Sequence, residues 1–293
     1  MSADASRNRV LGTLPVHLVG AGPGDPGLLT RRGAELLACA HAVFHDELVA
    51  AAVLDLAPGA TRFPVGRRAG IPGRDPLGTA AQMARLARRG QRVVRLKGGD
   101  SYLYGRGAEE ALALLDAGVP FVVVPGVSSA FAAPAAMGIP LTHRDLASSV
   151  TILTGHRRPD MTPARWRALA MGADTLVVMM GGRRLDQITG DLVAAGKPAA
   201  TPAAVVVAAT TPQQEHLVGS LGTIAAEARR LELGTPAIMV VGEVVRLAET
   251  LNCPALPDLM AAGGVAAPPP ATSLVGSGRS SPAGKLTNLV GID

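Results

Sequence analysis

A glycine-rich turn lies in residues 95–110, which read Arg-Leu-Lys-Gly-Gly-Asp-Ser-Tyr-Leu-Tyr-Gly-Arg-Gly-Ala-Glu-Glu. Val93 and Val94 precede it and a helical pattern follows, so the segment predicts a turn that joins a strand to a helix. Its glycines permit positive φ angles and a close approach of the backbone to a ligand. Asp100 and Arg106 add opposite charges. We therefore interpret the turn as a ligand-binding loop of an α/β layer, with an ordinary surface loop as the alternative.

Strand and helix patterns alternate on both sides of this turn. We predict strands at 16–19, 42–45, 93–96 and 119–124, with helices at 30–40, 76–89 and 107–117. Such alternation is typical of a layer with a largely parallel sheet. The pattern then restarts, with strands expected at 150–153, 175–180, 203–208 and 237–241.

This restart predicts two α/β domains, at 15–145 and 146–252, with a cleft between them. A flexible N-terminus at 1–14 and a disordered tail at 253–293, rich in Ala, Gly, Pro and Ser, flank them.

Composition narrows the class of protein. Aromatic residues make up only 2% of the chain, which argues against base stacking and a nucleic-acid partner, although the pI of about 9.9 leaves an RNA-interacting protein as an alternative. The two cysteines are far apart and no signal peptide is recognisable, so we expect a cytoplasmic protein. Residues 119–142 carry no charged side chain, but their prolines predict buried soluble segments and no membrane partner.

Two further motifs suggest other ligands. Residues 20–25 nearly match the dinucleotide fingerprint, and Asp46 stands about where a ribose-binding acid is found. However, Pro23 removes an amide donor and Asp25 places a carboxylate where a pyrophosphate needs amides, so a nicotinamide enzyme is the weaker interpretation. His41 and His45 are four residues apart without an evident third ligand except Asp46, so we expect no metal.

Polar side chains follow several of the predicted strands. Asp46 is expected at the carboxyl end of a strand, where α/β active sites lie, or as a helix cap. Arg67 and Arg68 follow a predicted strand at 61–65 and are either solvated or available to bind acidic groups. Ser128 and Ser129 lie in a tight turn that either caps a helix or binds a ligand.

Taken together, these segments resemble the tetrapyrrole methylase family over about residues 15–250. The resemblance is carried by residues 19–30 (Val-Gly-Ala-Gly-Pro-Gly-Asp-Pro-Gly-Leu-Leu-Thr), 93–100, 105–110, 124–126 and 138–144. It implies two α/β domains of the tetrapyrrole methylase type, with the active site and S-adenosyl-L-methionine in the cleft between them, and a homodimer. It also implies two methyl transfers to ring carbons of uroporphyrinogen III, a polyanionic tetrapyrrole, to give precorrin-2 on the route to cobalamin or sirohaem. Alternatives are another tetrapyrrole methylase of the same fold, which acts on a corrinoid precursor, and a non-catalytic cofactor-binding relative.

The resemblance also implies roles for individual residues. Asp46 matches the family's proton acceptor, and Arg67 stands at the position of its proton-donor lysine. Because a guanidinium does not release a proton at neutral pH, we expect Arg67 to pair with substrate carboxylates. From their charge, Arg68, Arg106 and Arg144 are further candidates for substrate binding. The implied cofactor contacts are Pro23, Gly98, Gly99, Asp100, Leu103, Ser128, Ser129, Met180 and Ala209, the last of which replaces a usual glycine.

Overall fold

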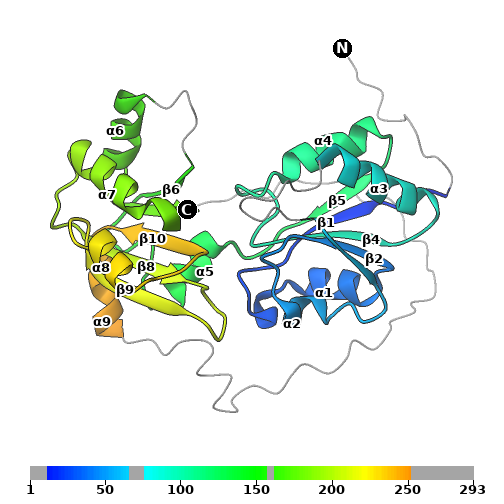
Figure 1. Cartoon of the computed structure of the whole chain (residues 1–293), viewed down its shortest axis with the longest axis horizontal. Coiled ribbons are helices and arrows are strands. Elements are labelled where there is room, and N and C mark those ends of the chain that lie inside the picture. The colour runs from blue at the N-terminus through cyan, green and yellow to red at the C-terminus, as the bar shows by residue number, and fades with distance from the viewer. Residues whose placement is uncertain (1–11, 66–75, 157–161, 252–293) are drawn as a thin grey trace, which may run out of the picture.

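The computed structural model describes residues 12–65, 76–156 and 162–251 of the chain (Figure 1). These residues form two five-stranded sheets, each with helices on both faces. Residues 1–11 of the expected flexible N-terminus and the whole expected tail at 253–293 lie outside the described residues.

The first sheet is entirely parallel, which agrees with the predicted largely parallel sheet, and its strand order is β3-β2-β4-β1-β5. Its central strands are mostly apolar because helices bury both faces, α3 and α4 on one and α1 and α2 on the other (Figure 1). The elements are β1 (Val16–Gly20), α1 (Arg31–Ala38), β2 (Ala42–His45), α2 (Ala51–Leu54), β3 (Thr61–Pro64), α3 (Pro76–Arg88), β4 (Val93–Lys97), α4 (Gly107–Asp116) and β5 (Phe121–Val124).

The second sheet is mixed, with order β6-β7-β10-β8-β9. Only β6 and β7 pair in parallel; the other pairs are antiparallel. Strand β9 was not predicted, because it is a partly exposed edge strand that lacks a continuous apolar run. The elements are α5 (Ser129–Ala135), β6 (Val150–Thr154), α6 (Pro163–Met171), β7 (Thr175–Met179), α7 (Leu185–Ala194), β8 (Pro202–Val207), β9 (Glu215–Ser220), α8 (Ile224–Arg230), β10 (Ala237–Val241) and α9 (Leu247–Leu251), with short 3-10 helices at Pro26–Leu28, Gly182–Arg184 and Glu243–Arg246.

Helix α5 links the two sheets. It follows β5 of the first sheet, but Ala130 and Ala133 pack against Val177 and Val240 of the second sheet. The Ser128 hydroxyl accepts a hydrogen bond from the Ala130 amide (3.2 Å), so the helix-cap interpretation of this serine is confirmed. The division of the chain at residue 145 stays a prediction.

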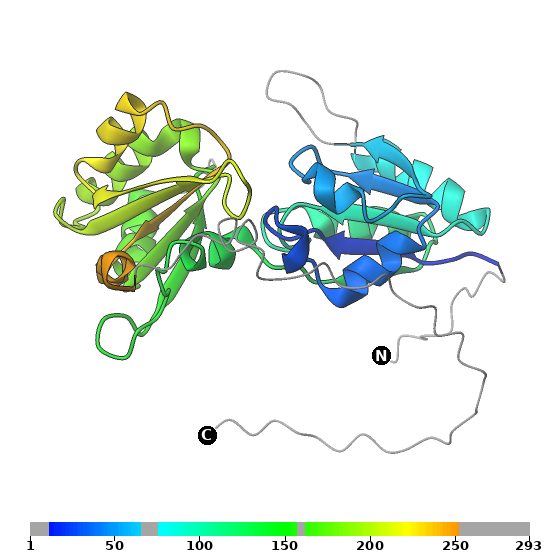
Figure 2. The ribbon, with the colours of Figure 1, turned by 90° about the horizontal axis from the view of Figure 1, so that it is seen from below.

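The two halves meet at loops that follow β1 and β4 (Figure 2). The Asp25 amide donates to Oγ1 of Thr210 (3.2 Å), and the Tyr104 hydroxyl donates to the carbonyl of Ile152 (3.0 Å). A Cβ atom at Gly24 would lie 2.5 Å from a methyl group of Thr211, so the approach leaves no room for a side chain there. Loops at the carboxyl ends of the first sheet therefore face the second half, which is where α/β proteins bind ligands. Among the described helices, none is long and apolar enough to cross a membrane.

Candidate active site

The loops after β1, β4 and β5 pack against one another through glycines. A Cβ atom at Gly20 would lie 2.5 Å from the Gly126 amide nitrogen and 2.7 Å from the Gly99 carbonyl oxygen, so only glycine fits. The Gly99 amide donates to the Gly22 carbonyl (2.8 Å). By contrast, a Cβ atom at the exposed Gly98 would meet nothing within 4 Å, so the backbone there borders open space that a ligand can occupy.

Asp100 holds two of these loops in place. One of its carboxylate oxygens accepts from the Gly126 amide (3.0 Å) and the other accepts from the Tyr102 amide (2.8 Å). The turn after β4 is thereby fixed to the turn after β5 before any ligand binds.

Backbone strain is concentrated where the two halves approach. Of the six non-glycine residues with positive φ in the described ranges, five lie in loops after β4, β7 and β8. They are Tyr104 (53°), Arg106 (57°), Met180 (57°), Ala208 (46°) and Thr210 (65°). Such conformations cluster at ligand sites because the surrounding structure must hold them.

A buried group of charges lies beneath these loops, between β4 and α4. Asp46 immediately follows β2 and its side chain is 28% exposed, whereas Arg95, Lys97 and Glu110 are 4%, 2% and 10% exposed. Arg95 forms an ion pair with Asp46 and also binds Glu110 (Nη2–Oε1 2.8 Å). Lys97 binds the other oxygen of Glu110 (3.1 Å), and the Gly98 amide donates to Asp46 (3.3 Å).

The pKa values reflect this environment. Burial favours loss of the Arg95 proton, but the attraction of Asp46 and Glu110 outweighs it and the pKa of Arg95 is raised. Burial, followed by repulsion from Arg95, lowers the pKa of Lys97 even though both carboxylates oppose the change. Asp46 is the most exposed member of the group and accepts a hydrogen bond from the Gly98 amide, so it lies where the buried charges meet the loops above.

The structure brings most of the predicted site residues to this region. Asp46, Gly98, Gly99 and Asp100 lie at adjoining strand ends, with Ser128 and Ser129 in the neighbouring β5–α5 turn. From the second half, Met180 follows β7 and is 41% exposed, while Ala209 follows β8 and is buried. Leu103 packs against the same apolar cluster as Ala209, and Pro23 is half-buried in the loop after β1.

The predicted substrate-binding arginines are less closely grouped. Arg106 is exposed and pairs with Glu109 (3.4 Å), and Arg144 is exposed in the loop before β6. Arg67 and Arg68 lie outside the described residues.

Sequence reasoning overlooked the roles of Arg95, Lys97 and Glu110. Alternate residues of a strand share a face, so Arg95 and Lys97 were placed side by side by the strand pattern itself. Glu110 lies on the buried stripe of α4 with Ala111 and Leu114. Charged residues on the buried faces of a predicted strand and of the helix that follows it could therefore have indicated this buried charge group.

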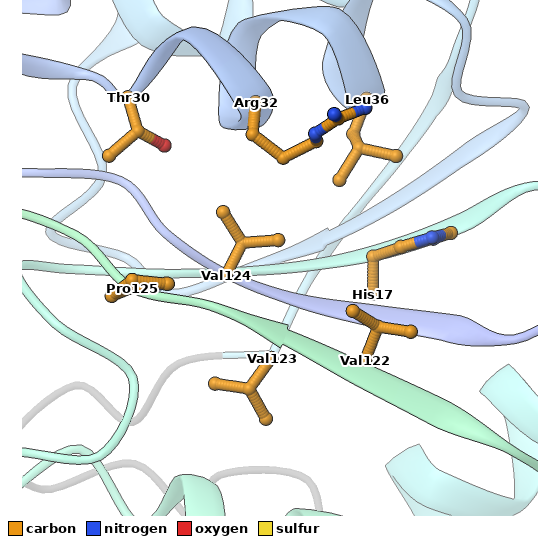
Figure 3. Close-up of a pocket in the computed structure, with 8 residues that line it drawn as sticks. All are labelled: His17, Thr30, Arg32, Leu36, Val122, Val123, Val124 and Pro125. Atoms are coloured by element: carbon orange, nitrogen blue, oxygen red, sulfur yellow. The ribbon is translucent and has the colours of Figure 1, made fainter. Parts of the chain in front are cut away.

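A separate hollow of about 460 Å³ lies on the flank of the first sheet, between α1 and the edge strand β5 (Figure 3). Val122 and Val124 point into it, with His17 and Arg32 at its border. This hollow is on the α1 face of the sheet, opposite the face on which Arg95 meets Glu110. It does not adjoin the buried charges.

His41 and His45, whose spacing in the sequence resembles that of metal ligands, have other contacts. His41 Nδ1 accepts from the Arg92 amide (2.9 Å), and His45 Nδ1 lies 3.0 Å from the Asp46 carbonyl oxygen. Within the described ranges, no group of three His, Cys, Asp or Glu side chains is arranged to hold a metal ion.

A parallel sheet followed by a mixed sheet, with glycine-containing loops where the two halves meet, defines the class of α/β protein to which the chain belongs. Residues 15–225 match the family model of tetrapyrrole (corrin/porphyrin) methylases, and the chain belongs to this family.

Curated and solved relatives support the same membership. The chain is 47% identical over 242 residues to a siroheme synthase of Yersinia pseudotuberculosis, which covers 82% of this chain and 50% of that protein. The chain thus spans about half the length of the curated relatives it matches. A uroporphyrin-III C-methyl transferase from Thermus thermophilus, solved with S-adenyl homocysteine, is 40% identical with a TM-score of 0.68, covering 80% of this chain and 100% of that one. A cobalt precorrin-4 methyltransferase is 28% identical with a TM-score of 0.71, covering 79% and 95%.

Proposed function

We propose that this protein transfers methyl groups from S-adenosyl-L-methionine to two ring carbons of uroporphyrinogen III, giving precorrin-2 for sirohaem or cobalamin synthesis. The observation that carries the proposal is a partly exposed carboxylate, Asp46, beside the open backbone of Gly98, in a chain 40% identical to the whole Thermus thermophilus enzyme. Further activities of the longer siroheme synthases are not part of the proposal.

The loop residues suit a cofactor with both apolar and polar parts. The open backbone at Gly98 lets a ligand approach the loop closely, while Leu103 and the exposed Met180 offer apolar contact. Pro23, Asp100, Ser128, Ser129 and Ala209 border the same loops and complete the proposed set. When bound, S-adenosyl-L-methionine supplies a methyl group already activated by its sulfonium, so the chain has to orient the acceptor carbon and exclude water.

Asp46 is the proposed proton acceptor. As the new carbon–carbon bond forms and the carbon–sulfur bond breaks, the tetrapyrrole releases a proton while its ring bonding readjusts. The Asp46 carboxylate takes that proton, and its fixed contacts with Arg95 and Gly98 keep it oriented.

Arginines are proposed to bind the carboxylates of the substrate. Arg106 is exposed beside the loop after β4, and Arg67, Arg68 and Arg144 supply further guanidinium groups. A planar guanidinium binds a carboxylate through two parallel hydrogen bonds, which suits a polyanionic tetrapyrrole.

A second acceptor deserves testing because a cobalt precorrin-4 methyltransferase has the same fold. Its lower identity, 28% against 40%, supports uroporphyrinogen III as the first choice.

Anaerobic incubation with S-adenosyl-L-methionine and either uroporphyrinogen III or a cobalt-corrinoid precursor tests both choices. We expect mass spectrometry to show a gain of two methyl groups on uroporphyrinogen III and none on the corrinoid. Methylation of the corrinoid alone would transfer the proposal to the second acceptor. No methylation of either, under conditions in which a known methylase works, would contradict the proposed function.

We also propose that the protein works in the cytoplasm as a homodimer. Among the residues that the structure describes, the exposed Cys39 forms no disulfide, which fits a reducing compartment. Light scattering coupled to size-exclusion chromatography gives the molar mass directly, and a monomer mass at working concentration would contradict the dimer.

A further inference from the structure

The buried charges next to Asp46 join the end of β2, the strand β4 and the helix α4. The fork of Arg95 is fully used: Nε and Nη2 donate to Glu110, Nη2 also to Asp46, and Nη1 to the carbonyls of Leu96 (3.0 Å) and Phe44 (3.4 Å). Its position is therefore fixed from three elements, and it holds Asp46 in one orientation.

Lys97 and Glu110 balance the ion pair of Arg95 and Asp46. Lys97 lies 3.1 Å from Glu110 and 3.9 Å from the Asp46 oxygen that faces Gly98. In the described residues around Asp46, two carboxylates thus share two buried cations, and His45 contacts the Asp46 carbonyl.

A contribution to stability is not a sufficient reason for these buried charges. A buried ion pair seldom stabilises a protein more than well-packed apolar residues would, because its desolvation is costly. The central strand of the second sheet, β10, is equally buried and consists of Ala-Ile-Met-Val-Val. What distinguishes β4 is that its charges reach a partly exposed carboxylate at the loops.

We propose that Lys97 and Glu110 are positioning residues that act on Asp46, directly and through Arg95, with opposite effects on its readiness to accept a proton. Lys97 places a positive charge beside Asp46, whereas Glu110 places a negative charge beside it and competes for the same two cations. The inference rests on the proposed role of Asp46 as proton acceptor.

Two nearly isosteric variants give opposite predictions. In Lys97→Met the group has one excess negative charge, so the acidic limb of the kcat/KM profile moves to higher pH. In Glu110→Gln it has one excess positive charge, so the limb moves to lower pH. Each displacement should be about one pH unit, the smaller end of what a neighbouring charge does to a carboxylate. The control Glu243→Gln, which removes an exposed partner of Arg246, should leave the limb in place.

A direct readout separates this inference from the proposed function. The pH midpoint of the Asp46 carboxyl ¹³C signal, assigned by its loss in Asp46→Asn, needs no substrate and should move in the same opposite directions. Opposite shifts with an inactive wild type would contradict only the function. Unmoved midpoints, or shifts of the same sign in both variants, would overturn the positioning roles even if the wild type methylates uroporphyrinogen III.

Arg95→Lys provides a further test if Lys97→Met or Glu110→Gln does not fold. It keeps the charge but loses the fork, so kcat should fall about tenfold or more while the KM for S-adenosyl-L-methionine and the acidic limb stay unchanged. An unchanged kcat would show that Asp46 does not depend on the Arg95 fork for its orientation, and would overturn the part of the proposal that acts through Arg95.

Discussion

The central strands of the two sheets, β4 and β10, are both completely buried but differ in chemistry. β4 reads Val-Val-Arg-Leu-Lys and β10 reads Ala-Ile-Met-Val-Val. Charged side chains remain in β4 because Glu110 and Asp46 compensate them, whereas β10 contributes apolar packing alone. The difference sets the first half, whose buried charges reach the partly exposed Asp46 carboxylate, apart from the second half, whose central strand is apolar.

Of the effects that test this difference between β4 and β10, the largest is expected at Asp46. Asp46→Asn should lower turnover about 10²–10⁴-fold, the usual contribution of a positioned proton acceptor. Binding of S-adenosyl homocysteine, measured by calorimetry, should change little because the amide keeps the shape of the side chain.

Asp55→Asn is the matched control, since Asp55 is exposed at the end of α2 and pairs with Arg62 away from the buried charges. Wild-type turnover in Asp46→Asn would remove Asp46 from the chemistry and would leave β4 without a functional distinction from β10.

The next largest effects are losses in the free energy of unfolding, which have different causes at β4 and at β10. Glu110→Ala leaves two buried cations, Arg95 and Lys97, with Asp46 as their single carboxylate partner and should lower the free energy of unfolding by about 3–5 kcal/mol. Met239→Ala in β10 creates a cavity and should cost about 2–5 kcal/mol. Urea unfolding measures both.

The stability losses of Glu110→Ala and Met239→Ala should respond differently when Lys97→Met is added. Adding Lys97→Met to Glu110→Ala removes the surplus cation and should recover part of the loss, because Arg95 and Asp46 then balance each other. Adding Lys97→Met to Met239→Ala should only lower stability further. Equal behaviour of the two double variants would show that charge does not distinguish β4.

A smaller effect is expected where the halves touch. Tyr104 has a positive φ, and its hydroxyl donates to the Ile152 carbonyl of β6 at 3.0 Å, so Tyr104→Phe should lower the free energy of unfolding by about 1 kcal/mol. Tyr102→Phe removes the same group from a side chain that is 52% exposed and should have no effect. An equal loss in both variants would deny that Tyr104 joins the halves.

Sequence patterns predicted the first sheet better than the second. Its central strands are mostly apolar and are regularly separated by helices, so their positions and the location of Asp46 at a strand end could be read from the chain. Strand β9 has no such pattern, because it depends on pairing with β8. Likewise, α5 carries no signal for which sheet it covers. The buried charges come from β2, β4 and α4, and periodicity gives the face of each side chain but not its partner.

The smallest effect concerns Asp174, whose carboxylate is exposed and contrasts with the buried charges of β4. Hydrogen bonds from the Ser148 amide, and from the hydroxyls of Ser149 and Ser148, lower the pKa of Asp174 below its ordinary value of 3.8. The ionised side chain therefore stabilises the fold fully above that value, and the contribution is lost as the pH falls through the lower, folded-state pKa. Asp174→Asn should move the urea midpoint slightly downward at pH 7, and the difference from wild type should shrink only in strong acid. Asp145→Asn, in the preceding loop, should show no such pH-dependent difference. A gap for Asp174→Asn that closes near neutral pH instead would mean that another titrating group, and not this carboxylate, fixes the loop before β6.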